Sequence, residues 1–354
     1  MARFDLPYGK NTLSFELPDS YRVTLLAPNR ADPAPDPLAA VNRALDEPVG
    51  DVTLADFAGA RSAAIAINDK TRPVRHQLLL PPLLKRLALL GLPPEAITLI
   101  IATGAHPPMT PDEYPAILPA KIIERYPILC HNVEDRESLS YLGRTERGTP
   151  VWINSGYANA EIRLAVGNME PHQFMGFSGG AKSAVIGLAG TETITHNHAM
   201  MTHTRARLGT YADNPARQDV EEMSQLVGVH FVLNAILNEE KKIVTVLAGA
   251  PEAVMQQGIP QVRQIFQVDV AQPFDLMIVS PGGHPKDINV YQSQKGLAHA
   301  ALVTKPGGSI ILAAACPEGS GSSKYEGWMV GKSSYQQVFD SFEQEGFRVG
   351  PHKA

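Results

Sequence analysis

Short apolar runs, each followed by a polar turn that contains glycine or proline, recur along the chain. Five of them are rich in isoleucine, leucine, valine and alanine and lack a regular alternation of apolar and polar positions: 63–67, 97–101, 163–167, 275–279 and 309–314. Continuous apolar runs of this length are typical of strands that are buried on both faces of a parallel sheet. The pattern therefore predicts a strand at each of these positions.

Segments with helical spacing lie between the predicted strands. Residues 81–90 carry leucines spaced for one helix face, and Gly91 is a stop signal. Residues 219–227 and 335–343 show similar spacing. This alternation of strand and helix predicts an α/β protein with mainly parallel, Rossmann-like sheets.

A new strand–helix series begins after a helical stretch, near residues 268–273. We therefore expect two domains, a larger N-terminal α/β domain over 1–268 and a smaller C-terminal α/β domain over 273–354. We expect the active site in the cleft between them.

Composition excludes several classes of protein. The chain has 354 residues and a net charge of -5, with 31 basic and 36 acidic side chains and no long block of like charge. Nucleic acids and anionic membranes bind concentrated basic surfaces, so neither is expected as a partner. Two cysteines and an N-terminus without an apolar signal sequence favour a cytoplasmic protein.

Polar side chains of types used in catalysis and ligand binding follow directly on the predicted strands. Asp69 and Arg72 follow the first strand, His106 the second and His172 the third, and Gly282-Gly283-His284 follows the fourth. Ligands of open α/β sheets bind beyond the carboxyl ends of the strands. These side chains are therefore candidates for one site.

The glycine-rich segment 176–183 allows three interpretations. It matches the G-x-S-x-G elbow of serine hydrolases around Ser178, but no strand stands immediately before it. It differs from a phosphate loop because Ala181 stands where glycine is needed. In the third interpretation, small residues let the backbone approach an anionic group, and Lys182 opens a helix as a nucleophile or attachment point.

The pair His196-Asn197-His198 can supply a metal ligand. On a helix the two rings point about 200° apart, which leaves one of them for the site. Together with His106 and His172, the chain has enough imidazoles for zinc, with Glu170 or Asp69 as a base. The sequence contains no H-E-x-x-H motif and no paired C-x-x-C motif.

Taken together, these segments resemble one family, the nickel-pincer lactate racemase (LarA-type) proteins and their homologues. The motifs that carry the resemblance keep family-like order and spacing from about residue 60 onward: Asp69-Lys70-Thr71-Arg72-Pro73, Ala102-Thr103-Gly104-Ala105-His106, Glu170-Pro171-His172, Gly176-Phe177-Ser178-Gly179-Gly180-Ala181-Lys182, Asn197-His198, Asp213-Asn214-Pro215 and Tyr291-Gln292-Ser293-Gln294-Lys295.

The resemblance implies a cofactor. Family members carry nickel in a pyridinium-3,5-bisthiocarboxylate mononucleotide, the nickel-pincer nucleotide, which is attached covalently to a lysine. Lys182 matches this attachment point and His198 matches the histidine ligand of nickel. Soft sulfur donors with an imidazole suit Ni(II). We expect Ser178, Gly179 and Gly180 to approach the cofactor, and Asp69 to bind its ribose or orient its neighbours.

The implied activity is racemisation or epimerisation of a small 2-hydroxy acid, lactate or a related one, by reversible hydride transfer. His106 and His172 match the two catalytic bases of the family. The resemblance assigns substrate binding to four residues: Arg72, Tyr291, Gln292 and Lys295. Cofactor-biosynthesis enzymes are implied as transient partners.

The sequence also departs from the family. Pro107-Pro108 follows His106, where members commonly carry arginine, so lactate itself stays open as the substrate. Ile186 precedes Gly187, where proline is frequent. The chain ends at Ala354, where relatives continue, and we expect the family's final segment to be missing.

Two alternatives stay open. One is a zinc-dependent hydrolase that uses His172, His196 and His198. The other is a non-catalytic homologue that binds a nucleotide or a carboxylate.

Overall fold

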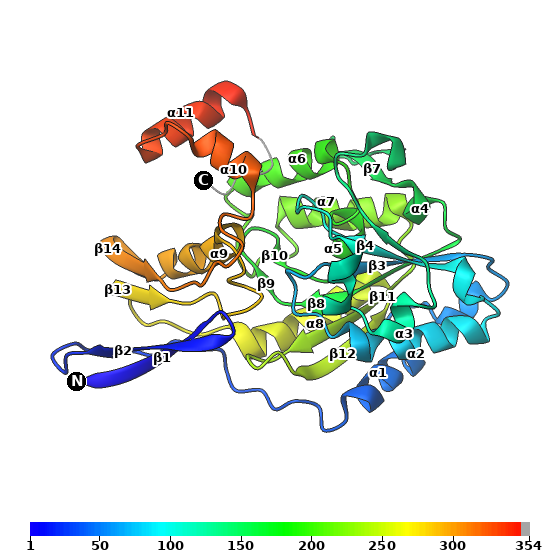
Figure 1. The fold of residues 1–354 in the computed structure, drawn as a ribbon, viewed down its shortest axis with the longest axis horizontal. Coiled ribbons are helices and arrows are strands. Elements are labelled where there is room, and N and C mark those ends of the chain that lie inside the picture. The colour runs from blue at the N-terminus through cyan, green and yellow to red at the C-terminus, as the bar shows by residue number, and fades with distance from the viewer. Residues whose placement is uncertain (348–354) are drawn as a thin grey trace. The chain divides into compact units, whose positions relative to one another are not determined.

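The computed structural model describes residues 1–347 and divides into two compact units. The larger unit is Arg30–Phe266, and the smaller unit combines Met1–Asn29 with the chain from Gln267 onward (Figure 1). Residues 348–354 lie outside the described residues. They include the chain end, Ala354, after which we expected the family's final segment to be missing. No helix among residues 1–347 is both long and apolar enough to cross a bilayer.

The larger unit is built on a six-stranded sheet with the strand order β12-β11-β8-β3-β4-β5. The strands are parallel except for β12, which runs antiparallel to β11 at the edge. The mixed α/β architecture with a mainly parallel sheet is therefore confirmed. The strands are β3 Ala63–Asn68, β4 Ile97–Ala102, β5 Ile128–Cys130, β8 Ile162–Met169, β11 Phe231–Leu237 and β12 Ile243–Gly249.

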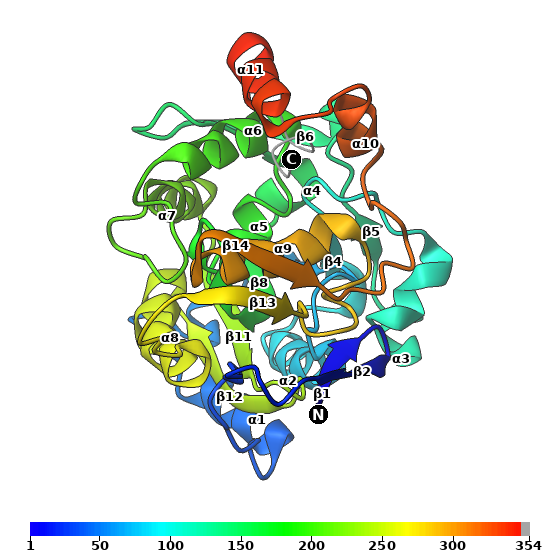
Figure 2. The same cartoon turned by 90° about the vertical axis from the view of Figure 1, so that its left-hand side faces the viewer.

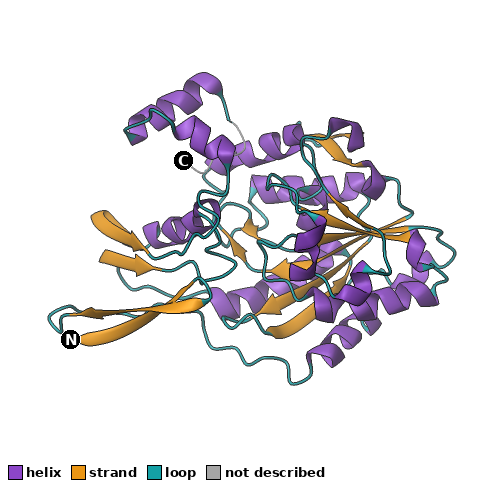
Figure 3. Ribbon diagram, viewed as in Figure 1, coloured by secondary structure: helices purple, strands orange, loops and turns teal. Residues whose placement is uncertain are grey.

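Helices cover both faces of this sheet, as Figure 3 shows. They are α1 Pro37–Asp46, α2 His76–Leu89, α3 Ala120–Ile123, α4 Ser155–Ala158, α5 Lys182–Val185, α6 Thr191–Ala199, α7 Pro215–Val227 and α8 Pro251–Phe266. Two short antiparallel pairs complete the unit, β6 Leu139–Arg144 with β7 Pro150–Asn154 and β9 Pro171–His172 with β10 Gly176–Phe177. Short 3-10 helices lie at Leu54–Phe57, Pro94–Ala96, Pro111–Ala116, Arg136–Ser138 and Met200–Thr202.

The two faces of the sheet carry side chains of different size. Large residues such as Ile65 and Leu164 join the leucines of α2 in the main hydrophobic core. The alternate positions of the same strands carry Ala64, Ala66 and Ala165, and α5 packs against β3 and β8. Small side chains on this face let a short helix approach the carboxyl ends of the strands closely.

The predicted helix over 81–90 begins earlier than expected. Helix α2 starts at His76 and includes Pro81 and Pro82. The expected start at Pro81 rested on the leucine spacing from residue 83 onward, which does not mark the first turn of the helix. The helix continues through both prolines, and the burial of leucines on both sides of them compensates for the missing amide hydrogens.

The smaller unit contains a βαβ element and an N-terminal hairpin (Figure 2). Strands β13 Phe274–Val279 and β14 Thr304–Leu312 pair in parallel, and α9 Val290–Ala301 lies between them in the chain. Strands β1 Ala2–Tyr8 and β2 Asn11–Leu17 pair antiparallel. Two helices follow, α10 Ser323–Met329 and α11 Tyr335–Glu345.

The first 29 residues group with the C-terminal part of the chain, which differs from the expected domain over 1–268. The Gly9 amide donates to the buried carboxylate of Asp287 at 2.6 Å, and the His284 amide donates to the Gly9 carbonyl at 2.7 Å. Hydrogen bonds between residues so far apart in sequence leave no periodic pattern, so the sequence did not indicate them. The second observed division, at Gln267, lies beside the expected boundary at 268–273.

One buried histidine makes the stability of the larger unit sensitive to acid. His76 is 1% exposed, and neither ring nitrogen has a hydrogen-bond partner of good geometry among the described residues. Burial lowers the pKa of His76 from 6.5 to about 4, although the Ile117 backbone and Asp69 oppose the shift. The unfolded chain therefore binds a proton at a higher pH than the folded chain does.

We expect the free energy of unfolding to fall by on the order of 3 kcal/mol between pH 6.5 and pH 4 through this group alone. His76→Leu should flatten this dependence, whereas His203→Leu, at an exposed position, should keep it. Denaturant unfolding of the full chain at several pH values measures the slope. Identical slopes in the wild type and His76→Leu would contradict the assignment.

Candidate active site

The structure brings Asp69 and His106 together. Asp69 follows the last residue of β3, and His106 lies in the loop after β4. Because β3 and β4 are parallel neighbours, their carboxyl ends meet at one edge of the sheet. The His106 Nδ1 lies 2.6 Å from the Asp69 Oδ2. A carboxylate at this distance fixes the orientation of the imidazole.

The Asp69 carboxylate is fully engaged. Its Oδ1 accepts hydrogen bonds from the Thr71 amide at 3.1 Å and the Thr71 hydroxyl at 2.7 Å, and the side chain is almost completely buried. Burial by itself raises the pKa of Asp69, but the charge and hydrogen bond of His106, with Arg72 and Thr71, lower it overall to about 2. These contacts support the orienting role expected for Asp69, and a contact with a ribose stays a prediction.

Arg72 lies beside this pair. Its Nη1 donates to the Thr71 hydroxyl at 3.2 Å, and its own amide donates to the Asp69 carbonyl at 3.2 Å. The side chain is half-buried, so a guanidinium charge stands at the rim of the carboxylate–imidazole pair. This arrangement suits the binding of a carboxylate next to a base.

His172 and His198 both contact one aromatic ring, that of Phe174. The Phe174 ring meets the His172 ring edge-on at a centroid distance of 5.0 Å, and the His198 ring at the same distance. The two imidazoles therefore lie within about 10 Å of each other. Nothing in the sequence pattern indicated Phe174, since an aromatic residue in a loop has no periodic signal.

Helix α7 holds the segments that carry these side chains. The amide group of Asn214, which caps the helix, donates to the Phe174 carbonyl at 2.7 Å. Arg217 is fully buried, and its Nη1 donates to the carbonyls of Phe177 and Gly179, each at 3.2 Å. Its Nε donates to the Glu221 carboxylate at 2.7 Å. Arg217 was not predicted as a functional residue, because a charged residue in an amphipathic helix has the pattern of a surface position.

The glycine-rich segment packs against the interior of the larger unit. The Ser178 hydroxyl accepts from the Glu170 amide at 3.0 Å and donates to the Asn168 carbonyl at 3.2 Å. The Gly180 amide donates to the Asn234 side chain at 2.6 Å. A serine used in this way closes a turn, and the short strand before it belongs to a two-stranded pair. The elbow and phosphate-loop interpretations therefore lack their required setting.

Lys182 opens α5 immediately after this segment, as the third interpretation predicts. Its side chain is half-buried, and so is that of His198 near the end of α6. Residues 1–347 contain no group of three or more His, Cys, Asp or Glu side chains that could hold a metal. A metal at His198 would therefore need further donors from a bound group. Lys182 and His198 offer an amine and an imidazole, the two protein groups that the cofactor implied by the family resemblance uses.

The zinc site considered from the sequence is not assembled. His196 and His198 lie on α6, and the His196 Nδ1 lies 2.9 Å from the Thr149 hydroxyl, whereas His198 faces Phe174. This divergence follows from the helical spacing of the two residues.

Three predicted substrate-binding residues belong to the smaller unit. Tyr291, Gln292 and Lys295 lie on α9, where the Lys295 ammonium donates to the side-chain oxygen Oε1 of Gln292 at 2.6 Å. Asn289 caps this helix, and its side chain accepts from the Gln292 amide. The helix thus holds a cation and an amide side by side, and their contact with a substrate stays a prediction.

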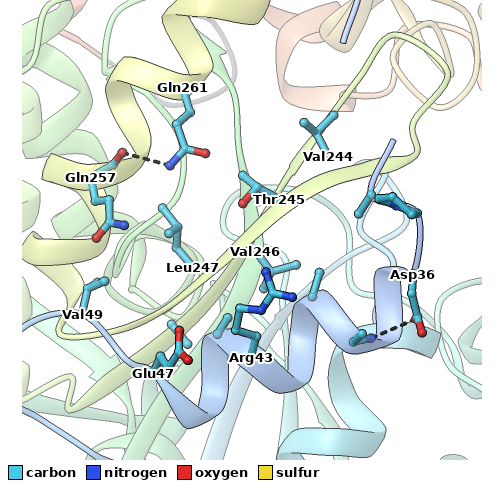
Figure 4. A pocket seen from close by; sticks show the side chains of 16 residues that line it. Asp36, Arg43, Glu47, Val49, Val244, Thr245, Val246, Leu247, Gln257 and Gln261 are labelled. Carbon is cyan, nitrogen blue, oxygen red and sulfur yellow. Dashed lines mark hydrogen bonds between the residues drawn. The ribbon is translucent and has the colours of Figure 1, made fainter. Parts of the chain in front are cut away.

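A cavity of about 520 Å³ lies at the outer edge of the large sheet, between α1, β12 and α8 (Figure 4). Its polar lining includes Arg43 of α1, Glu47 directly after that helix, and Gln257 and Gln261 of α8. None of the predicted site residues lines it. This cavity is therefore distinct from the histidines at the carboxyl ends of the strands.

Comparison with known proteins identifies relatives along the whole chain. Family models described as the lactate racemase N-terminal domain and the lactate racemase C-terminal domain match residues 8–209 and 269–348. A lactate racemase of Thermoanaerobacterium thermosaccharolyticum is 33% identical over 352 residues, which span 98% of this chain and 82% of the relative. A lactate racemase of Lactiplantibacillus plantarum is 32% identical over 331 residues, 92% of this chain and 77% of the relative.

Solved structures agree with these matches. The lactate racemase apoprotein from T. thermosaccharolyticum superimposes with a TM-score of 0.90 at 32% identity, over 99% of this chain and 84% of that one. A protein from Thermotoga maritima, 20% identical, has a TM-score of 0.70 over 89% of this chain and 81% of that one. The second match shows the shared fold alone.

The close packing of the glycine-rich segment gives a testable consequence. A Cβ atom on Gly179 would lie 2.4 Å from the Met169 Cγ, and its φ is +94°. Gly209 has a φ of +73°, but nothing lies within 4 Å of its Cβ position. We expect the free energy of unfolding to fall by about 1–2 kcal/mol in both alanine variants because of the backbone conformation. In Gly179→Ala it should fall by about 1–3 kcal/mol more because of overpacking. Denaturant unfolding measures both, and equal losses would contradict the packing.

Proposed function

The chain belongs to the lactate racemase family, and we propose that it interconverts the enantiomers of a small 2-hydroxy acid. In this proposal Lys182 would hold a nickel-pincer nucleotide, which would supply a reversible acceptor for the Cα hydrogen as a hydride. The observation that carries the proposal is the contact between the buried Asp69 and the half-buried His106, 2.6 Å apart, with the Arg72 guanidinium beside it. A fixed base next to a carboxylate-binding cation is what a 2-hydroxy acid requires.

The two enantiomers present their hydroxyl groups in opposite directions, so two bases are needed. The Asp69 carboxylate accepts a hydrogen bond from the His106 Nδ1–H, so the lone pair of the neutral ring is on Nε2. That nitrogen takes the hydroxyl proton and returns it. Arg72 binds the substrate carboxylate with two parallel hydrogen bonds and holds the hydroxyl near the base.

His172 is held in a different state. The Met175 amide donates to the His172 Nδ1 at 3.3 Å, which places the hydrogen of the neutral ring on Nε2. In this state His172 donates a hydrogen bond to a substrate oxygen. It acts as the second base through Nε2 only after the contact with Met175 breaks.

The proposed cofactor, when bound, supplies a reversible hydride acceptor. Lys182 would hold it through the covalent bond to its amine, and His198 would hold the nickel through an imidazole nitrogen. Tyr291, Gln292 and Lys295 of the smaller unit would bind the substrate oxygens, as the family resemblance implies. The exposed Pro107-Pro108 follows His106 where family members commonly carry arginine, so the 2-hydroxy acid has to be identified by assay.

The experiment that tests this function uses protein produced together with the cofactor-biosynthesis enzymes. Intact-mass and metal analysis should show an adduct of mononucleotide size and about one nickel per chain. Lys182→Ala should lose the adduct, the nickel and the activity, because no other amine replaces the attachment point. Lys85→Ala, at an exposed position on α2, is the matched control and should keep all three. Full activity in Lys182→Ala would rule out the proposal.

The role of Asp69 gives a separate prediction. In Asp69→Asn the amide can present its NH₂ group to His106, which then carries its hydrogen on Nε2 and loses its function as a base. We expect the adduct and nickel to remain and kcat to fall about 10²–10⁴-fold. Asp46→Asn changes a surface carboxylate paired with Arg86 and should leave kcat unchanged. A wild-type rate in Asp69→Asn is the outcome that contradicts the orienting role.

A further inference from the structure

A buried chain of hydrogen bonds lies behind His198. It starts at Asp219 of α7, which is completely buried. Its carboxylate accepts from the hydroxyls of Thr145 at 2.7 Å and Thr149 at 2.9 Å, and from the side-chain NH₂ of Asn197 at 2.8 Å. This series of hydrogen bonds ends at the His198 Nδ1, which lies 3.2 Å from the Asn197 Oδ1.

The surroundings allow only one orientation of the Asn197 amide. Its NH₂ group donates to the Ala216 carbonyl at 2.9 Å and to the Asp219 carboxylate. Both groups accept hydrogen bonds and cannot donate them. The opposite orientation would place three oxygens against one another in a buried site, which is costly. The Asn197 Oδ1 therefore faces His198.

This orientation determines the state of the imidazole. An amide oxygen accepts hydrogen bonds and has no hydrogen to donate, so the His198 Nδ1 must carry the hydrogen. The lone pair of the neutral ring is then on Nε2. We propose that Asn197 and Asp219 are positioning residues that hold His198 in the Nδ1–H form and direct its Nε2 to the nickel. The nickel part rests on the proposed function, and the tautomer does not.

The same carboxylate holds His196 by a separate route. The Thr149 hydroxyl donates to Asp219, so it accepts from the His196 Nδ1, 2.9 Å away. Removal of the Thr149 hydroxyl therefore disturbs His196 and leaves the link from Asn197 to His198 intact. This branch gives a matched control within one hydrogen-bond network.

The first measurement is the tautomer of His198 in the ¹⁵N-labelled apoprotein, above the pH at which imidazole is protonated. Long-range ¹H–¹⁵N correlation should show the Nδ1–H form in the wild type. Asn197→Ala should shift His198 toward a mixture of both forms, and Thr149→Val should shift His196 alone. Asn197→Asp, whose carboxyl group can share a proton with Asp219, should keep the Nδ1–H form. An Nε2–H form of His198 in the wild type would overturn the proposal.

The second measurement is nickel retention in protein loaded with the cofactor, challenged with a chelator. Partners that orient a histidine ligand contribute about 10–100-fold to metal affinity. Asn197→Ala should therefore lose nickel about 10–100-fold faster than the wild type while it keeps the adduct on Lys182. Thr149→Val should retain nickel like the wild type. Unchanged retention in Asn197→Ala overturns the positioning role, whereas a wild type with the expected tautomer but no nickel overturns the proposed function instead.

Discussion

Close packing of small residues between the His106 loop and α5 is the constraint on which the candidate site depends. The Gly104 amide donates to the Gly187 carbonyl at 2.9 Å. A Cβ atom on Gly187 would lie 2.7 Å from the Cβ of Ala102, at the end of β4. The chain after α5 therefore lies directly against the strand that leads to His106. Because Lys182 begins the same helix, one packing contact relates the proposed attachment point to the proposed base, and a larger side chain at Gly187 would push the two segments apart.

Two buried carboxylates orient the imidazoles of the candidate site. Asp69 orients His106 through a direct hydrogen bond, and Asp219 orients His198 through the amide of Asn197. Burial of a carboxylate is costly unless hydrogen bonds satisfy it, and an apolar side chain of similar volume often stabilises a fold as well. What the carboxylates add is control of the nitrogen on which each imidazole carries its hydrogen. That control has value for proton transfer and for metal binding and little value for stability alone.

The sequence predicted those features that depend on local patterns. The apolar runs over 63–67 and 97–101 indicated neighbouring buried strands, and the rule for parallel sheets then placed Asp69 near His106. The sequence did not predict contacts between residues that lie far apart along the chain. Arg217 has the spacing of a surface residue in an amphipathic helix, yet it is buried against the carbonyls of the glycine-rich segment. The grouping of residues 1–29 with the C-terminal unit likewise depends on hydrogen bonds between distant residues, which no window of sequence contains.

The glycine-rich segment shows how contacts decide among motifs that share the same letters. A nucleophilic serine needs an exposed hydroxyl at the top of a central strand, but the hydroxyl of Ser178 is spent on two backbone groups. A phosphate loop needs amides that point outward, but the Gly180 amide points at Asn234 in the interior. The glycines are therefore required by the fold itself. The residue that follows the segment is the half-buried Lys182, and our proposal therefore assigns the chemistry of this loop to the lysine and not to the glycines or the serine.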